Sequence, residues 1–215
     1  MTDFVLIVSI VSHGKQELVT DSAVRAGSFG GTTLKGRGIS SNSIVAALGI
    51  DSVKDVVYIV CQRSQEGKIR NSIIQGLSNE KKHTGCIFTV SAGELHRKEG
   101  LAIEQGETNM SQNFTHDVIN VIVNRGFADD VMDAARKAGA GGGTVINARG
   151  TAREDDERFF GMHIVPEKEM LIIVVEHSNK DKVMNAIQNL ECLSEPGSGI
   201  VYTLPAESFE PLGRK

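Results

Sequence analysis

The chain has 215 residues, a formal net charge of −4 at pH 7 and a sequence pI near 5.9. This weakly acidic balance gives no basic field that would attract a phosphate backbone or an anionic membrane surface, so nucleic acid is not an expected partner. No run approaches the ~20 apolar residues of a membrane span, and the N-terminus lacks a charged region before an apolar stretch. We therefore expect a cytoplasmic protein without membrane insertion.

In the first half of the chain, the apolar residues alternate between strand and helix patterns. Phe4–Val11 is a β-branched run that ends in a polar turn, and it predicts a buried strand. Apolar residues at helical spacing over 15–26, followed by Gly27, predict a helix. The rest of this half predicts a strand at Thr32–Leu34, a polar loop over 36–54, a strand at Val56–Cys61, a helix over 66–78 and a strand at Cys86–Val90.

The second half repeats the first. Residues 14–38 reappear 112 positions later as residues 126–150, and 11 of the 25 aligned positions are identical. The register continues with a two-residue shift, so that 56–60 matches 170–174 and 85–89 matches 199–203. Strands are predicted at Val118–Val123, Gly143–Asn147, Met170–Val175 and Ile200–Leu204, and helices over 129–138 and 180–190.

Each half therefore has the order β-α-β-β-α-β, which is typical of the ferredoxin-like split βαβ unit. Such a unit is an antiparallel sheet with helices on one face. We expect an α+β protein made of two such domains in tandem. Domain 1 spans residues 1–92, a polar linker spans 93–115 and domain 2 spans 116–215.

The long strands carry apolar residues at consecutive positions, so both faces of each sheet should be covered. Domains of roughly 100 residues are also near the small end of self-sufficient domains. Both observations favour pairing of the two domains with each other or with other chains, and we expect a homo-oligomer.

Residue types that support catalysis or metal binding are scattered. The three cysteines, Cys61, Cys86 and Cys192, form no CxxC pair, and the six histidines form no HxH or HExxH motif. Two of the cysteines fall in apolar strand-like runs, where reduced buried thiols are usual. We therefore expect no disulfide framework, no metal site and no catalytic residues, and the chain is not expected to be an enzyme.

Glycine-rich segments follow the first helix and precede the last strand of each half. The second half has Ala-Gly-Ala-Gly-Gly-Gly-Thr-Val at 138–145, Gly-Ser-Gly-Ile-Val-Tyr at 197–202, and Phe159-Phe160-Gly161 ahead of Pro166-Glu167-Lys168. This combination resembles the P-II family of nitrogen-regulatory signalling proteins, in which these segments are the turn into strand two, the B-loop and the T-loop. The resemblance covers both halves and is stronger in the second. It implies a trimer, or another ring of domains, that binds ATP or ADP in clefts between subunits, responds to 2-oxoglutarate and regulates a partner protein through its T-loops.

The resemblance implies nucleotide-binding residues in both halves, because glycines let backbone N–H groups approach phosphates and the family's threonine contacts the nucleotide. The implied residues are Thr32, Arg37, Gly85, Thr144, Arg149, Arg153, Gly197, Ser198 and Gly199. Two alternatives stay open from the residues themselves. The glycines also suit helix termination and tight turns, and loop arginines are equally suited to pairing with a carboxylate.

Several positions depart from the family's pattern. Cys86 and Ile200 stand where the family usually has a phosphate-binding lysine, so both candidate sites lack a strong cation. Lys168 is the nearest counterpart of the lysine that contacts 2-oxoglutarate. It lies one residue out of register from Pro166, which weakens the case for that ligand.

The loop that contains Arg158, Phe159 and Phe160 is the expected partner-binding segment, because aromatic anchors dominate protein–protein hot spots. The alternative is that its aromatic residues fold back onto the chain's own core. Two functions follow. The first is a signalling protein that binds adenine nucleotide and regulates a partner in nitrogen metabolism or transport. The second is a P-II-like scaffold that has lost its ligand and acts only as a protein–protein adaptor.

Overall fold

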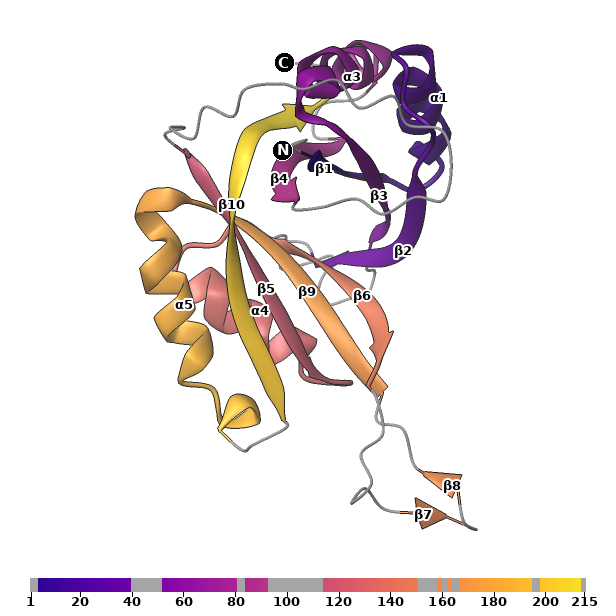
Figure 1. Ribbon diagram of the computed structural model, residues 1–215. Coiled ribbons are helices and arrows are strands. Elements are labelled where there is room, and N and C mark those ends of the chain that lie inside the picture. Colours follow the sequence, from indigo (N-terminus) through magenta and orange to yellow (C-terminus); the bar gives the residue numbers. More distant parts are fainter. Residues whose placement is uncertain are drawn as a thin grey trace. The chain divides into compact units, whose positions relative to one another are not determined.

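The computed structural model describes residues 4–39, 52–80, 84–92, 114–150, 158–159, 162–163, 167–194 and 198–213 (Figure 1). Its described residues form two compact units. Unit 1 is drawn from Met1–Lys35, Val53–His116 and Pro205–Lys215, and unit 2 from Gly36–Ser52 and Asp117–Leu204. The units follow the two halves of the sequence except that each contains a segment from the other half, which the predicted division into 1–92 and 116–215 does not include.

Unit 1 has the expected pattern of strands and helices. It contains β1 (Phe4–Ser12), α1 (Gln16–Arg25), β3 (Ser52–Gln62), α3 (Arg63–Gly76) and β4 (Gly85–Ala92), with the start of β2 (Thr32–Ile39) and the end of β10 (Gly199–Leu212). Strand β1 lies between β3 and β4 and is antiparallel to both. The end of β10 pairs with the other edge of β4.

Unit 2 has the same pattern. It contains β5 (His116–Asn124), α4 (Ala128–Lys137), β6 (Gly143–Arg149), β9 (Glu167–Glu176) and α5 (Lys180–Gln188), with short 3₁₀ turns η1 (His177–Asn179) and η2 (Glu191–Leu193). The strand order is β6-β9-β5-β10, and residues 36–39 of β2 pair with the free edge of β6. A separate two-stranded sheet joins β7 (Arg158–Phe159) to β8 (Met162–His163).

Both units therefore place the fourth, first, third and second strands of the repeat side by side. This mixed α+β arrangement is consistent with the expected ferredoxin-like unit. The predicted helix ends at Gly27 and Gly139 are confirmed, because these glycines have φ values of 104° and 106°, a region that other residues rarely adopt.

Each unit has a hydrophobic core between its helices and one face of its sheet. In unit 1, Ile7 and Ile59 of the sheet pack in one cluster with Val19, Ile69 and Ile73 of the helices. The corresponding cluster of unit 2 joins strands β5, β6 and β9 to helices α4 and α5, which lie on one side of that sheet in Figure 1. The apolar spacing that predicted the helices is the pattern that buries these side chains.

The apolar residues on the second face of each sheet are also largely buried within a single chain. Val8, Val56 and Phe88 of unit 1 are at most 3% exposed, and Val118 and Ile172 of unit 2 are similar. The homo-oligomer stays a prediction.

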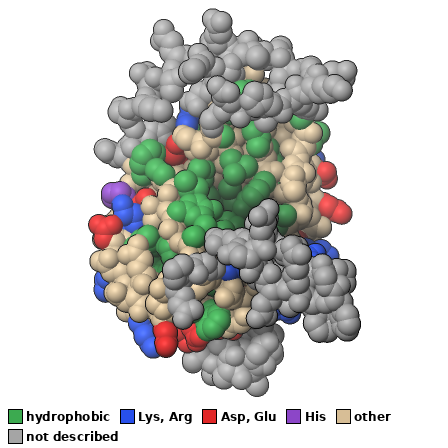
Figure 2. All heavy atoms as spheres, turned by 60° about the horizontal axis from the view of Figure 1, so that its bottom comes forward, with side chains coloured by type: hydrophobic (Ala, Val, Ile, Leu, Met, Phe, Trp, Pro, Cys, Tyr) green, Lys and Arg blue, Asp and Glu red, His purple; other side chains and the backbone are tan. Residues whose placement is uncertain are grey.

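Some large apolar side chains remain exposed. Hydrophobic side chains gather on one face of the molecule in Figure 2. The exposed large apolar residues are Val24, Phe29, Val53 and Val60 in unit 1, and Phe127, Ile200 and Tyr202 in unit 2. Phe29 and Val60 are of interest because they belong to the same pocket, described below.

Two hydroxyl groups in the buried part of unit 1 lead to opposite stability predictions. The Ser9 hydroxyl is fully buried without a hydrogen-bond partner among the described residues, whereas the Thr89 hydroxyl donates to Glu66 Oε1 at 3.0 Å. We expect Ser9→Ala to raise the free energy of unfolding by about 1 kcal/mol and Thr89→Val to lower it by about 1 kcal/mol. Urea denaturation followed by circular dichroism measures both. A loss of stability in Ser9→Ala would show that its hydroxyl is satisfied in solution.

Candidate functional site

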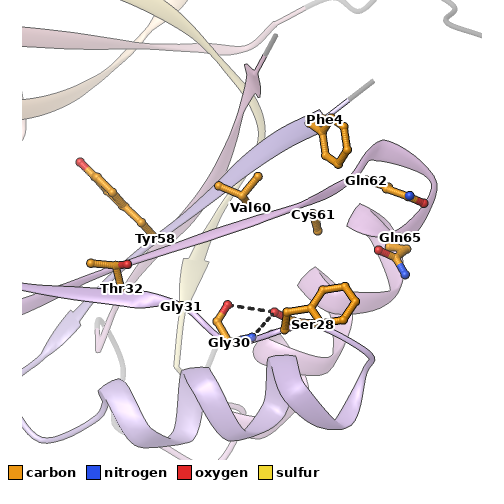
Figure 3. A pocket seen from close by; sticks show the side chains of 11 residues that line it. Phe4, Ser28, Gly30, Gly31, Thr32, Tyr58, Val60, Cys61, Gln62 and Gln65 are labelled. Atoms are coloured by element: carbon orange, nitrogen blue, oxygen red, sulfur yellow. Dashed lines mark hydrogen bonds between the residues drawn. The ribbon is translucent and has the colours of Figure 1, made fainter. Parts of the chain in front are cut away.

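A pocket of about 290 Å³ opens in unit 1 beside the glycine-rich turn that leads into β2 (Figure 3). Five segments form it: the start of β1, the turn after α1, the first residue of β2, the second half of β3 and the first turn of α3. Its lining residues are Phe4, Ser28, Phe29, Gly30, Gly31, Thr32, Tyr58, Val60, Cys61, Gln62 and Gln65. All of them belong to unit 1.

The glycine-rich turn forms one wall because it lies directly against β3. A Cβ atom added at Gly31 would come within 2.9 Å of the Tyr58 carbonyl oxygen, so only glycine permits this approach. Gly30 has φ of 111°, and its N–H donates to Ser28 Oγ at 3.2 Å while the Ser28 hydroxyl donates to the Gly30 carbonyl at 3.1 Å. These two hydrogen bonds fix the turn locally and use the Gly30 N–H.

The chemistry of the lining is neutral. It combines the rings of Phe4, Phe29 and Tyr58 with the carboxamides of Gln62 and Gln65, and among the lining residues that the structure describes none is Lys, Arg, Asp, Glu or His. Burial, with a smaller effect from the negative charge of Glu66, raises the pKa of the Cys61 thiol to about 12, so this side chain is also uncharged at neutral pH. A concave, mostly apolar lining with a few polar groups is typical of small-molecule sites.

Of the predicted site residues, Thr32 lines the pocket and Arg37 does not. Arg37 lies in the part of β2 that belongs to unit 2, where Nη1 donates to Asp129 Oδ1 at 3.0 Å and Nη2 donates to Glu169 Oε1 at 3.4 Å. Pairing with a carboxylate was one of the two roles that the sequence left open for this arginine. Arg149, its counterpart in the second half, is exposed at the end of β6.

The B-loop glycines have a packing role in both halves. A Cβ atom at Gly85 would clash with the Ile10 carbonyl oxygen, and one at Gly199 would clash with the Ile122 carbonyl oxygen. Ile10 and Ile122 are themselves equivalent in the repeat. Both glycines therefore let the fourth strand of the repeat approach the first, a reason for glycine that is independent of any ligand.

The remaining predicted residues fall into three groups. Thr144 is buried in β6 opposite Ile172, and Ser198 accepts a hydrogen bond through its carbonyl from Lys168 Nζ at 3.4 Å. Arg158 and Phe159 are described only as backbone in β7. Arg153, Gly197 and Phe160 lie outside the described residues.

Sequence reasoning missed a pair of buried carboxylates. Asp55 in β3 and Glu169 in β9 are equivalent in the repeat, and each is at most 5% exposed. Asp55 Oδ2 accepts the Gly14 N–H at 3.0 Å, and Glu169 Oε2 accepts the Gly126 N–H at 2.9 Å. Each carboxylate thus holds the turn that follows the first strand. The available signal was an acidic residue at the same position of an apolar strand in both halves.

Lys168 has a similar structural role. Its Nζ donates to Asn124 Oδ1 at 2.6 Å, in addition to the Ser198 carbonyl. The equivalent residue in unit 1, Lys54, donates to Ser12 Oγ at 3.4 Å. In each half, a lysine on the third strand of the repeat therefore donates a hydrogen bond to the end of the first strand. Lys168 thus has a structural role besides the expected contact with a ligand.

The described residues include no group of three or more His, Cys, Asp and Glu residues that could hold a metal ion. Among the helices of this described part, none is long and apolar enough to span a membrane.

Comparison with known proteins finds a family similarity in the second half of the chain. Residues 116–212 match the family model of nitrogen regulatory protein P-II. Among curated proteins, no match is found.

Three solved structures named as PII, GlnK or CPII proteins are similar to this chain. PII of Arabidopsis thaliana bound to citrate is 22% identical, with 53% of this chain and 96% of that chain covered and a TM-score of 0.39. GlnK of B. subtilis is 15% identical, with 45% and 96% covered and a TM-score of 0.35. CPII of Thiomonas intermedia K12 bound to ADP, AMP and acetate is 17% identical, with 47% and 91% covered and a TM-score of 0.31.

Proposed function

We propose that this chain, whose residues 116–212 match the P-II family model, is a P-II-like signalling protein that binds adenine nucleotide and regulates a partner protein in nitrogen metabolism or transport. The observation that carries the proposal is the unit 1 pocket. It lies at the turn before β2, where the resemblance implies a nucleotide site, and Thr32 lines it. Its volume of about 290 Å³ suits a planar ring system better than a complete nucleotide, because drug-sized ligands occupy pockets of roughly 300–1,000 Å³.

The base of the nucleotide is the part that fits this pocket. Aromatic rings of Phe4, Phe29 and Tyr58 offer stacking surfaces, and the carboxamide of Gln65 supplies both donors and an acceptor. We do not include 2-oxoglutarate, because Lys168 already donates to Asn124 and to the Ser198 carbonyl.

The hairpin of β7 and β8 is the proposed contact with the regulated protein. It forms a sheet of its own between β6 and β9, and its backbone carries Arg158 and Phe159. An aromatic residue next to an arginine in a loop is the residue combination that hot spots favour. The second candidate function, an adaptor without ligand, would use the same hairpin.

Isothermal titration calorimetry with ADP and ATP tests the nucleotide part of the proposal. We expect dissociation constants in the micromolar range for the wild type. Phe29→Gly, which introduces the residue found at the equivalent position Gly141, should weaken binding by about tenfold, since a stacking contact contributes up to roughly 1.5 kcal/mol.

Val53→Ala is the matched control, because Val53 is an exposed apolar residue of unit 1 that does not line the pocket. This variant should bind as the wild type does. If no adenine compound binds the wild type, the nucleotide proposal fails and the adaptor function is left. Its partner would then be sought by affinity capture, with Phe159→Ala as the negative control.

A further inference from the structure

We propose that the unit 1 pocket recognises a purine base and is indifferent to its phosphates, so that adenosine, AMP, ADP and ATP bind with similar affinity. This inference rests on the proposed function, because it concerns the same pocket. A site of this kind responds to the total concentration of adenine compounds and not to the ratio of ATP to ADP, so the protein would sense a different quantity.

The side chains of the pocket provide no counter-charge for a phosphate. None of the described residues that line it carries a formal charge at neutral pH, and the Cys61 thiol stays protonated. Arg63 directly follows Gln62 in sequence, but Nη1 donates to Glu207 Oε2 at 2.6 Å and Nη2 donates to Ser91 Oγ at 2.6 Å. Tight phosphate sites normally use charge-assisted hydrogen bonds from Arg or Lys, and those of Arg63 are directed at unit 1 itself.

The backbone N–H of Gly30 does not replace the missing cation. Glycine-rich turns bind phosphate when their N–H groups point at the anion, but here the Gly30 N–H donates to Ser28 Oγ. The turn also follows the C-terminal end of α1, where the helix dipole is negative and repels an anion. The turn is therefore built like a phosphate loop in composition but not in hydrogen bonding.

The N-terminal end of helix α3 also lies at the pocket, but a carboxylate offsets the positive end of its dipole. Helix α3 begins at Arg63, and its N-terminal dipole would favour an anion. Its first turn contains Glu66, whose carboxylate accepts the Thr89 hydroxyl and lies 3.5 Å from Arg70 Nε. A fixed carboxylate in this turn already uses the favourable field, so a second negative charge gains little there.

The aromatic and uncharged polar side chains of the pocket are of the kinds that recognise a purine base. Figure 3 shows Gln62 and Gln65 on the same side of the pocket as the Phe4 ring, with Tyr58 and Thr32 at the opposite end. The Gln65 carboxamide and the Thr32 hydroxyl can pair with the donors and acceptors at a purine edge while the rings contact its faces. Such contacts are the same whichever phosphates the ribose carries.

The test is isothermal titration calorimetry of the full chain with adenosine, AMP, ADP and ATP at low and high salt. We expect the four dissociation constants to agree within about threefold and to change little between about 0.05 M and about 0.5 M NaCl, because a neutral contact is not screened. Phe29→Gly should weaken all four by the same factor. Lys35→Ala should weaken none, although Lys35 is the first cation after Thr32 in sequence.

The outcomes separate this inference from the proposed function. ATP or ADP binding about tenfold or more tightly than adenosine, with the advantage lost at high salt, would overturn phosphate indifference and leave nucleotide binding intact. A Lys35→Ala variant that loses ATP affinity and keeps adenosine affinity would do the same. If none of the four compounds binds, the proposed function fails together with the inference.

Discussion

Replacing Glu169 with alanine is expected to lower the free energy of unfolding by about 3 kcal/mol. The carboxylate is 5% exposed and accepts the N–H groups of Gly126 and Ala128 at 2.9 and 3.3 Å. It also lies 3.4 Å from Arg37 Nη2. The substitution removes the acceptor for two backbone donors, one of which belongs to the fully buried Ala128, and it removes a carboxylate partner from the partly buried Arg37 guanidinium.

Asp129 is the matched control for Glu169, because it contacts the same arginine from the surface. Its side chain is 68% exposed, so Asp129→Ala should cost less than about 1 kcal/mol. Glu169→Gln retains one acceptor and should fall between the two. Urea denaturation at neutral pH, followed by circular dichroism, gives all three values. Equal losses for Glu169→Ala and Asp129→Ala would show that the buried carboxylate does not hold the turn.

The sequence predicted those parts of the fold that depend on local pattern. The strand predicted at Phe4–Val11 is β1 (Phe4–Ser12), and the helix predicted over 15–26 is α1 (Gln16–Arg25). Apolar periodicity fixes such elements because the residues that define the period are also those that become buried. The helix predicted over 66–78 begins earlier, at Arg63, since its first turn is polar and carries no periodic signal.

The extensions of β2 and β10 could not be predicted in this way. Strand β2 continues from the expected 32–34 to Ile39, and β10 continues from the expected 200–204 to Leu212. Two glycines interrupt the first extension, while Pro205, Pro211 and two glutamates interrupt the second, and all of these residues are unfavourable in strands. The partners that compensate are far away in sequence, since Glu207 pairs with Arg63 across 144 positions.

The residues of the candidate site could likewise be predicted from the sequence only in part. The family resemblance implied Thr32 but not Phe4, Gln62 and Gln65, because these three come from other elements that meet only in the folded unit. Arg37 was implied as a ligand contact from its residue type alone. Its two carboxylate partners, 92 and 132 positions away, could not be read from the sequence.

Leu212→Ala is expected to lower the stability of unit 1 by about 3 kcal/mol, because deletion of a buried leucine side chain typically costs 2–5 kcal/mol. Leu212 is 2% exposed and packs in the hydrophobic core of unit 1, although it is at the far end of the last strand of the second repeat. Its backbone is opposite Gly85 in β4.

Hydrogen exchange read out by mass spectrometry locates the effect of Leu212→Ala. The amides of β4 should lose protection, since β4 pairs with the end of β10, whereas those of β9 in unit 2 should change little at temperatures below global unfolding. Glu210→Gln is the control on the same segment, because this half-exposed carboxylate pairs with Arg70 and should cost less than about 1 kcal/mol. Loss of protection in β9 with β4 unchanged would mean that residues 205–212 do not complete unit 1 in solution, and that the exchange of segments between the two halves is wrong.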